Sequence, residues 1–247
     1  MEAADTPDIA ERYAGFARNE ARHHSEVYQD WAEQLSCDAQ TVELVAQLPR
    51  DKRQPNIVFA AARLAGAEPG PYENLRHTLH ERFNEVAHHT ATRSTQTNEA
   101  ARLAVLLPVL AAVSQQHDDA PLALLEVGAS AGLCLYPDRY GYEYDDGVRV
   151  GPASSPVQLR CVVTGRGPVP TGVPRVVRRA GIDLNPLDPA DPDEVAWLQA
   201  LIWPGMDERR DRLSAAAADA VESAIVDAVV SASPGLGLET YSALLPC

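Results

Sequence analysis

The stretch Leu124-Leu125-Glu126-Val127-Gly128-Ala129-Ser130-Ala131-Gly132-Leu133 decides the fold of the second half of the chain. A short apolar run begins at Pro121 and ends at Gly128, which is typical of a buried strand followed by a sharp turn. Glycine is favoured where the backbone takes an unusual φ or comes close to a ligand. The stretch therefore predicts a strand, a glycine loop and a helix over residues 121–136, which together hold a nucleotide-like ligand that is polar or anionic.

The glycine loop has the pattern E-x-G-x-S-x-G. This pattern resembles motif I of S-adenosylmethionine-dependent methyltransferases more than the G-x-G-x-x-G pattern of dinucleotide-binding folds, because its glycine spacing differs from the latter. The resemblance implies S-adenosylmethionine as the cofactor and Glu126, Gly128, Ser130 and Gly132 as residues that bind it. Glu126 would accept hydrogen bonds from a ribose or an amine. A tight turn between strand and helix that binds no ligand remains an alternative.

A second cue for a methyltransferase lies in Ala180-Gly181-Ile182-Asp183-Leu184-Asn185-Pro186. A strand that ends in an acidic residue would place Asp183 on the hydroxyls of a ribose. Such an acid normally follows the glycines by about 20 residues. Here a Tyr/Gly-rich insert and another strand come between them. Asp183 is thus predicted to bind the cofactor, and the alternative is that it only leads into the turn at Pro186.

The same loop also matches the nucleophile elbow G-x-S-x-G of serine hydrolases at residues 128–132. That mechanism needs an acid and then a histidine after the serine in the chain. The last of the seven histidines is His117, which precedes Ser130. The order of the residues therefore argues against a hydrolase.

The rest of the chain indicates a helical first half and an α/β second half. We expect a helical N-terminal region over residues 1–118, a partial Rossmann-like, methyltransferase-like region over residues 119–230, and an irregular tail over residues 231–247. The fold class is accordingly α+β or α/β. Apolar spacing and punctuation by proline and glycine predict helices over residues 9–35, 38–48, 56–64, 72–89, 98–114, 191–202 and 207–230, and strands over residues 121–127, 157–163 and 175–184.

A dense polar run, Thr92–Glu99, leads into the helix predicted over residues 98–114. Threonine, asparagine and glutamate suit a helix N-terminus, where they satisfy free backbone amides. That role explains only part of the run, so we expect a polar wall of a binding pocket here. The residues predicted to bind the methyl acceptor are Arg93, Thr95, Gln96, Asn98 and Arg102.

Composition limits the possible partners. The 247 residues are 45% hydrophobic and carry a formal net charge of −14. Such acidity argues against nucleic acid and anionic membrane surfaces as partners. The most apolar stretch, residues 103–113, is interrupted by Pro108, and no run is long enough to span a membrane. The N-terminus is acidic and lacks the apolar core of a secretory signal, so we expect a cytoplasmic protein. With nucleic acid and membranes disfavoured, the expected partner is the small-molecule ligand of the glycine loop.

No metal site is expected. The four cysteines form no C-x-x-C pair, so a structural zinc site is not indicated, and we expect reduced thiols. Two Glu-x-x-His pairs, Glu20/His23 and Glu85/His88, have the spacing of di-iron helical bundles. The histidine of each pair belongs to a doublet, His23-His24 or His88-His89, amid polar residues. Such a doublet is more typical of a solvated helix face.

Several short motifs, taken together, resemble an uncharacterised bacterial family named domain of unknown function 2332. The resemblance extends from about Tyr13 to Ala220. The family has no established activity, and its glycine loop is similar to that of methyltransferases. The motifs are, in chain order, Arg53-Gln-Pro55, Thr95-Gln-Thr-Asn-Glu99, Leu125–Leu133, Asp138-Arg-Tyr140, Gly181-Ile-Asp183, Trp197 and Trp203-Pro204.

The sequence thus favours an S-adenosylmethionine-dependent methyltransferase-like protein. Methyl transfer is an in-line displacement in which positioning dominates, so no nucleophilic side chain is required. A complete methyltransferase sheet has more strands than are predicted here. The alternative is therefore a non-catalytic ligand-binding or interaction protein on an incomplete Rossmann-like scaffold.

Overall fold

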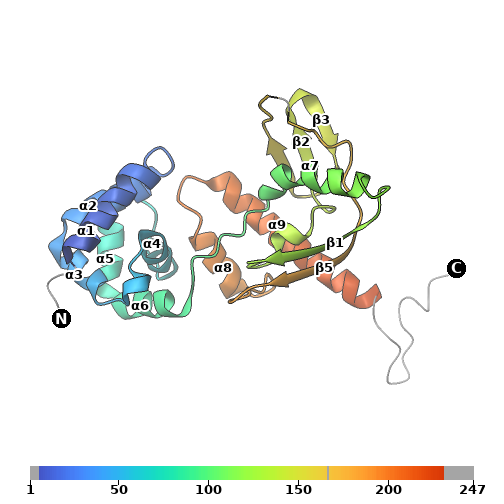
Figure 1. The fold of residues 1–247 in the computed structure, drawn as a ribbon. Helices are drawn as coiled ribbons and strands as arrows, with labels where there is room; N and C mark the ends of the chain where they lie inside the picture. Colours follow the sequence, from blue (N-terminus) through green and yellow to red (C-terminus); the bar gives the residue numbers. More distant parts are fainter. Residues whose placement is uncertain (1–5, 166, 231–247) are drawn as a thin grey trace, which may run out of the picture. The chain divides into compact units, whose positions relative to one another are not determined.

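A computed structural model describes residues 6–165 and 167–230 of the chain (Figure 1). The chain divides into two compact units, of which the first comprises Met1–Thr97 and Asp193–Asp211. The second comprises Asn98–Pro192 and Arg212–Cys247. The predicted irregular tail, residues 231–247, lies outside the described residues.

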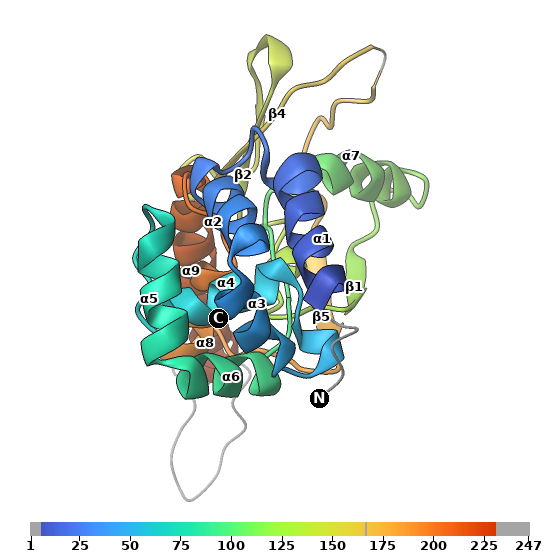
Figure 2. The same ribbon diagram turned by 90° about the vertical axis from the view of Figure 1, so that its left-hand side faces the viewer.

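The first unit is built from helices that alternate with short turns. Figures 1 and 2 show α1 and α2 packed side by side. The elements of this unit are α1 (Thr6–Phe16), the π-helical turn η1 (Ala17–Ala21), α2 (Glu26–Cys37), α3 (Ala39–Ala46), the 3-10 turn η2 (Arg50–Lys52), α4 (Pro55–Leu64), α5 (Tyr72–Glu81), α6 (Phe83–Thr92) and most of α8 (Pro192–Ala200).

An aromatic cluster forms the core of the first unit. Phe59 of α4 lies at its centre, with ring centroids of Tyr13, Tyr28 and Trp31 at 5.7, 5.0 and 5.6 Å. All three pairs have edge-to-face geometry, which aromatic rings prefer over a face-to-face sandwich. All four side chains are at most 1% exposed. The predicted apolar spacing of the N-terminal helices thus corresponds to a real core.

Two long helices predicted for this unit are each divided in the structure. The helix over residues 9–35 is interrupted after η1, where His23 has a left-handed backbone with φ of 67°. Ser25 then caps α2 by accepting a hydrogen bond from the Tyr28 backbone N–H at 3.3 Å. The helix over residues 72–89 is divided at Arg82, whose φ is −124°. Neither break carries glycine or proline, so the apolar spacing alone did not mark it.

The second unit combines two small sheets with helices. Its elements are α7 (Arg102–Gln115), β1 (Leu122–Val127), the 3-10 turn η3 (Leu133–Leu135), β2 (Gly141–Tyr144), the 3-10 turn η4 (Asp145–Gly147), β3 (Val148–Val150), β4 (Gln158–Cys161), β5 (Val176–Ile182) and α9 (Asp207–Val230) from Arg212 onward. Strands β1 and β5 pair in parallel, whereas the second sheet has the order β3-β2-β4. The chain is therefore a mixed α and β protein.

The predictions for the second unit are confirmed in part. The strand segments 121–127, 157–163 and 175–184 contain β1, β4 and β5. The Tyr/Gly-rich segment, which the sequence pattern marks as an insert, contains β2 and β3. The tyrosines at 140, 142 and 144 alternate along this segment and are all buried. Alternation with a period of two residues indicates a strand, so β2 could have been recognised in the sequence.

The prediction of a helix directly after the glycine loop is wrong. The structure has only the 3-10 turn η3 there, and it ends at Tyr136 with φ of −115° and ψ of 48°. Tyr136 precedes Pro137, and a residue before proline is disfavoured in the α region because of a clash with the proline ring. The loop therefore lacks the aligned dipoles of a long helix, which the sequence prediction had assumed.

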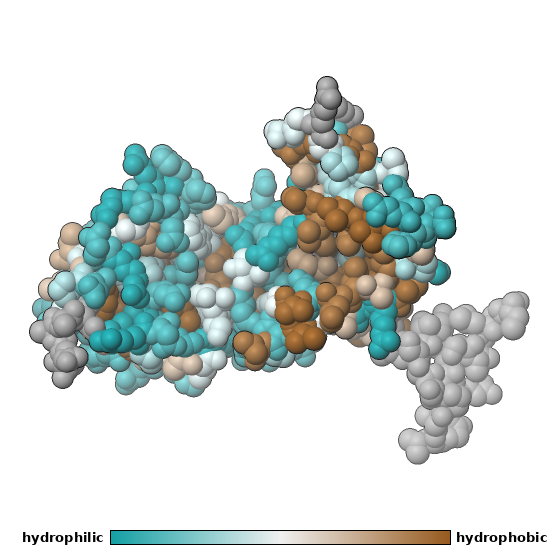
Figure 3. Space-filling view, viewed as in Figure 1, coloured by the Kyte–Doolittle hydropathy of each residue, from teal (hydrophilic) through white to brown (hydrophobic). Residues whose placement is uncertain are grey.

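One face of the β1–β5 pair is apolar and exposed. Leu125 and Val127 of β1 are 64% and 79% exposed, and Ile182 of β5 is 58% exposed. Val105 and Val109 of α7 are also largely exposed. Figure 3 shows apolar residues gathered over α7 and over this strand pair. The opposite face of the pair, which includes Leu124 and Glu126, is partly covered.

Candidate functional site

The glycine loop takes a left-handed backbone conformation at three positions. Gly128, Ser130 and Gly132 have φ of 79°, 50° and 70°. Glycine tolerates such angles because it has no Cβ, whereas serine adopts them rarely. The backbone N–H of Gly128 donates to the carbonyl of Ile182 at 2.7 Å, which fastens the loop to the end of β5. The two glycines of the motif therefore serve the turn, as the sequence predicted.

Gly181 on β5 allows the loop to pack closely against this strand. A Cβ placed at Gly181 would lie 2.8 Å from the Cβ of Ala129 and 3.4 Å from Cδ1 of Leu135. The first distance is shorter than real carbon contacts allow. Glycine is thus required at 181 for steric reasons, and it brings the loop and the end of β5 together.

Asp183 binds backbone groups on both sides of the loop end. Its Oδ2 accepts a hydrogen bond from the Ser130 N–H at 2.8 Å, and its Oδ1 accepts one from the Asn185 N–H at 2.8 Å. Both oxygens of this carboxylate therefore act as hydrogen-bond acceptors. Asp183 therefore shapes the loop and also borders the space beside it.

Asn98 holds the loop through its side-chain amide. Its Nδ2 donates to the carbonyl of Ala129 at 2.9 Å, and its Oδ1 accepts from the Leu133 N–H at 2.8 Å. The side chain is buried, with 8% exposed. The sequence predicted Asn98 as an acceptor-binding residue; the structure places its amide on the two ends of the glycine loop.

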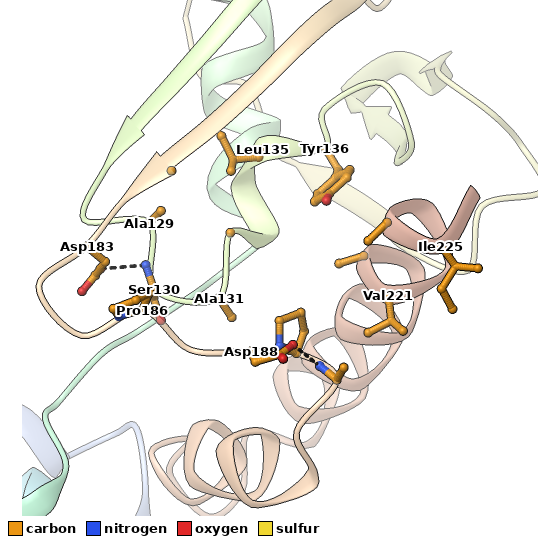
Figure 4. Close-up of a pocket in the computed structure, with 16 residues that line it drawn as sticks. Ala129, Ser130, Ala131, Leu135, Tyr136, Asp183, Pro186, Asp188, Val221 and Ile225 are labelled. Carbon is orange, nitrogen blue, oxygen red and sulfur yellow. Dashed lines mark hydrogen bonds between the residues drawn. The ribbon is translucent and has the colours of Figure 1, made fainter. Parts of the chain in front are cut away.

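A cavity of about 530 Å³ lies beside the loop within the second unit (Figure 4). Its polar lining residues are Ser130, Asp183 and Asp188, of which Ser130 and Asp183 lie side by side in the loop region (Figure 4). The apolar part of the lining includes Tyr136 and the α9 side chains Val221 and Ile225. Ligand pockets commonly have volumes of roughly 300–1,000 Å³. The size and the mixed lining fit a small molecule with a polar and an apolar part.

The Ser130 hydroxyl is a polar group at the wall of this cavity with no hydrogen-bond partner. The residue is 7% exposed, and its Oγ is buried and unpartnered. Buried polar atoms are nearly always hydrogen-bonded, so each exception requires an explanation. A bound ligand that accepts from or donates to this hydroxyl would provide one.

Glu126 and Gly128 do not line the cavity, although both were predicted to bind the cofactor. Glu126 lies on the partly covered face of β1, and its Oε2 is buried without a partner. Burial raises the pKa of the Glu126 carboxyl, the Arg102 guanidinium opposes this effect, and the negative charge of Asp183 adds to it. Of the predicted cofactor residues, Ser130, Gly132 and Asp183 do line the cavity.

The predicted acceptor-binding residues are divided between the two units. Asn98 and Arg102 belong to the second unit, while Arg93, Thr95 and Gln96 belong to the first. In the first unit, the guanidinium of Arg93 lies 5.5 Å from the ring centroid of Trp197 and donates to the carbonyl of Asp193 at 3.4 Å. The structure therefore does not bring these five residues together within one unit.

Sequence reasoning missed an array of three side chains beside the cavity. The guanidinium of Arg179 lies over the ring of Tyr136, 5.2 Å from its centroid. Its Nη2 also donates to both oxygens of Asp138 at 2.6 Å. Asp138 belongs to one of the short motifs quoted above, which was the only signal available in the sequence.

The family model for an uncharacterized protein conserved in bacteria, DUF2332, matches residues 10–229. The chain belongs to this family. The matched residues include parts of both units and the whole of the glycine loop, so all residues that line the cavity lie within the match. No curated protein and no solved structure matches the chain.

The described part of this DUF2332 protein has neither a membrane-crossing helix nor a cluster of metal-binding side chains. None of the helices in residues 6–165 and 167–230 combines the length and the apolar character that a membrane crossing requires. The same ranges hold no group of three or more histidine, cysteine, aspartate or glutamate side chains arranged to bind a metal ion.

Proposed function

We propose that the cavity beside the glycine loop binds S-adenosylmethionine and that the protein is methyltransferase-like. The observation that carries the proposal is the polar end of the cavity. There the unpartnered Ser130 hydroxyl and the Asp183 carboxylate lie at the end of two parallel strands. Ligands of Rossmann-like folds bind beyond the carboxyl ends of parallel strands, which supports this assignment.

The charge of the cavity favours a cationic ligand over a phosphate. Two carboxylates, Asp183 and Asp188, line the cavity, whereas none of its described lining residues is lysine or arginine. A phosphate brought near these carboxylates would be repelled, and a sulfonium or ammonium group would be attracted. S-adenosylmethionine carries both cations, so it fits this lining better than a nucleotide or dinucleotide.

The loop geometry supports a binding role in addition to a structural one. Ser130 holds a left-handed conformation that is unfavourable for a residue with a Cβ, and strained backbone of this kind is concentrated at ligand sites. Asp183 and Asn98 fix the loop from two directions, so its conformation is preorganised before a ligand arrives. For methyl transfer such positioning is the main requirement.

The proposed compartment is the cytoplasm. Cys37, Cys134 and Cys161 are free thiols in the described part of the chain. Burial raises the pKa of the Cys134 thiol to about 12, so that it stays protonated. Unpaired and unreactive cysteines are typical of a reducing environment.

A second candidate is a non-catalytic ligand-binding protein on an incomplete scaffold. One observation favours it: the parallel sheet beside the loop has two strands, β1 and β5, in the described residues, and one of its faces exposes Leu125 and Val127. Such a protein would bind the same ligand without transferring its methyl group.

Calorimetric titration of the purified chain with S-adenosylmethionine and with ATP tests the proposal. We expect S-adenosylmethionine to bind and ATP to bind at least about tenfold more weakly, because its phosphates meet two carboxylates. Absence of heat at millimolar S-adenosylmethionine, or a preference for ATP, would contradict the proposal. Formation of S-adenosylhomocysteine in the presence of a bacterial metabolite extract would identify an enzyme, and binding without turnover would support the second candidate.

A further inference from the structure

Strand β1 has an edge that faces away from β5. The backbone N–H groups of Leu122 and Gly128 donate to carbonyls at the two ends of the neighbouring strand, at 2.8 and 2.7 Å. In a parallel pair, alternate residues direct their N–H and C=O groups to the neighbour, and the residues between them direct theirs to the opposite edge. The even-numbered residues of β1 therefore face β5. The odd-numbered residues Ala123, Leu125 and Val127 direct their backbone groups outward.

The same three residues carry the exposed apolar side chains of the strand. Leu125 and Val127 are 64% and 79% exposed, and Ala123 is exposed as well. Ile182, which lies beside Val127 in the register of β1 and β5, is 58% exposed. Figure 2 shows β1 at the margin of the second unit, with β5 on its inner side, and Figure 3 shows the apolar surface over this pair. Outward backbone groups and exposed apolar side chains thus coincide.

An edge of this kind is suited to another β-strand. In the described residues β1 pairs with β5 alone, and two strands are fewer than the three or more that a stable sheet usually needs. Natural proteins often protect an exposed edge with a lysine or a proline. The stretch from Leu122 to Val127 contains neither, and its one charged residue, Glu126, lies on the partly covered face. Strand β1 is therefore an unprotected edge strand.

A second copy of the chain offers a complementary edge, which is β1 itself. Antiparallel pairing about a twofold axis sets odd-numbered residues opposite odd-numbered ones, so that N–H and C=O groups meet. With Leu125 opposite Leu125 of the second copy, Ala123 lies opposite Val127 and all three outward residues form hydrogen bonds. A different register would bring in Pro121, which has no N–H, or would set Glu126 opposite a second Glu126. The register centred on Leu125 is thus the favoured one.

We propose that β1 is a self-association surface, through which two copies of the chain join their strand pairs into one sheet of the order β5-β1-β1-β5. The occupant is a second copy because the paired residues, Leu125 with Leu125 and Ala123 with Val127, are apolar on both sides and match in hydrogen-bonding direction. This surface is independent of the proposed ligand, since none of these three residues lines the cavity beside the glycine loop.

Sedimentation equilibrium of the purified chain tests the association. We expect wild type to dimerise and Leu125→Arg to weaken the dimer at least about tenfold, because two guanidinium groups would meet across the twofold axis. Leu125→Val keeps an apolar strand former and should stay within about threefold of wild type. Val226→Arg adds the same charge at an exposed position of α9 and should leave the dimer unchanged. Circular dichroism checks that the variants are folded.

Disulfide formation tests the register. The Cα atoms of a hydrogen-bonded antiparallel pair lie about 5.5 Å apart, which a disulfide can bridge. Leu125→Cys should therefore give a disulfide-linked dimer under mild oxidation. Val127→Cys is the matched control, because its two copies would be offset by four residues, roughly 13 Å at about 3.4 Å per residue. Wild type, which has four natural cysteines, gives the background.

Two results would overturn the proposal. A wild-type chain that stays monomeric at every concentration reached would show that the edge of β1 does not join two copies, and would leave residues 231–247 or a different protein as its occupant. A dimer that Leu125→Arg leaves intact, with no more disulfide in Leu125→Cys than in Val127→Cys, would assign the association to another surface. Neither result bears on the binding of S-adenosylmethionine, which the titrations above measure separately.

Discussion

Asp183 accepts a hydrogen bond from the backbone N–H of Ser130 at 2.8 Å, although 53 positions separate the two residues in the sequence. The bond joins the end of β5 to the centre of the glycine loop. It places a carboxylate and the unpartnered Ser130 hydroxyl together at one end of the cavity. The loop and the acid at the end of β5, which the sequence suggested separately, therefore form one structure.

Neutralising Asp183 should weaken the binding of cations more than the binding of neutral ligands. Asp183→Asn keeps an oxygen that can accept from Ser130, but it removes the negative charge. We expect the affinity for S-adenosylmethionine to fall about tenfold and the affinity for adenosine to fall less than about threefold, because only the former is cationic. Calorimetric titration measures both. Glu222→Gln, which removes an exposed charge of α9 outside the cavity, should change neither; equal losses for both ligands in Asp183→Asn would argue against a cation at this end.

Removing the Asn98 amide should destabilise the chain. Asn98→Ala leaves the Ala129 carbonyl and the Leu133 N–H without their present partner in a buried site. An unsatisfied buried polar group costs about 1–3 kcal/mol, so we expect a loss of roughly 2 kcal/mol in the free energy of unfolding. Denaturant titration measures it. The exposed neighbour Thr97→Ala serves as the control, and an Asn98→Ala variant as stable as this control would show that the two bonds do not hold the loop.

Much of the loop could be predicted because its signals are local. Gly128 and Gly132 indicate left-handed backbone, and the apolar run before Gly128 indicates a strand. Both signals depend only on neighbouring residues, so the turn could be predicted from the sequence. The strands β2 and β3 were missed, although Tyr140, Tyr142 and Tyr144 alternate as a strand requires. Their hydroxyls donate to the carbonyls of residues 133, 137 and 104, and such partners are fixed only by tertiary packing.

The polar run before α7 shows what local patterns cannot provide. Its density of hydrogen-bonding groups suggested a single pocket wall, but the boundary between the two units falls between Thr97 and Asn98. Asn98 then finds its partners 31 and 35 positions away in the glycine loop. Tyr136 was overlooked for the same reason, since Arg179 and Asp138 lie 41 positions apart. Long-range pairing of this kind leaves no periodic signal in one sequence.

Close packing between Gly181 and Ala129 should appear as coupling between the two positions. Gly181→Ala would place a Cβ 2.8 Å from that of Ala129, so we expect destabilisation of roughly 1–3 kcal/mol from overpacking. Ala129→Gly removes the carbon that it meets. In a double-mutant cycle the combined variant should recover at least about 0.5 kcal/mol relative to additivity. Strictly additive free energies of unfolding would mean that the loop moves away from β5 without cost.

The partly buried carboxyl of Glu126 should make stability fall as pH rises. Burial raises its pKa above the ordinary value of 4.5, Arg102 opposes the shift, and Asp183 adds to it. Because the folded state holds this proton more tightly than the unfolded state, the stabilisation is complete below the unfolded pKa and is lost as pH rises through the folded pKa. Glu126→Gln carries no such proton. We therefore expect the stability of this variant relative to wild type to increase as pH rises above 4.5, measured by denaturant titration at several pH values. Glu222→Gln, at an exposed position of α9, should show a smaller dependence. A relative stability of Glu126→Gln that stays constant as pH rises, or decreases, would show that the Glu126 carboxyl is not held in its protonated form by the fold.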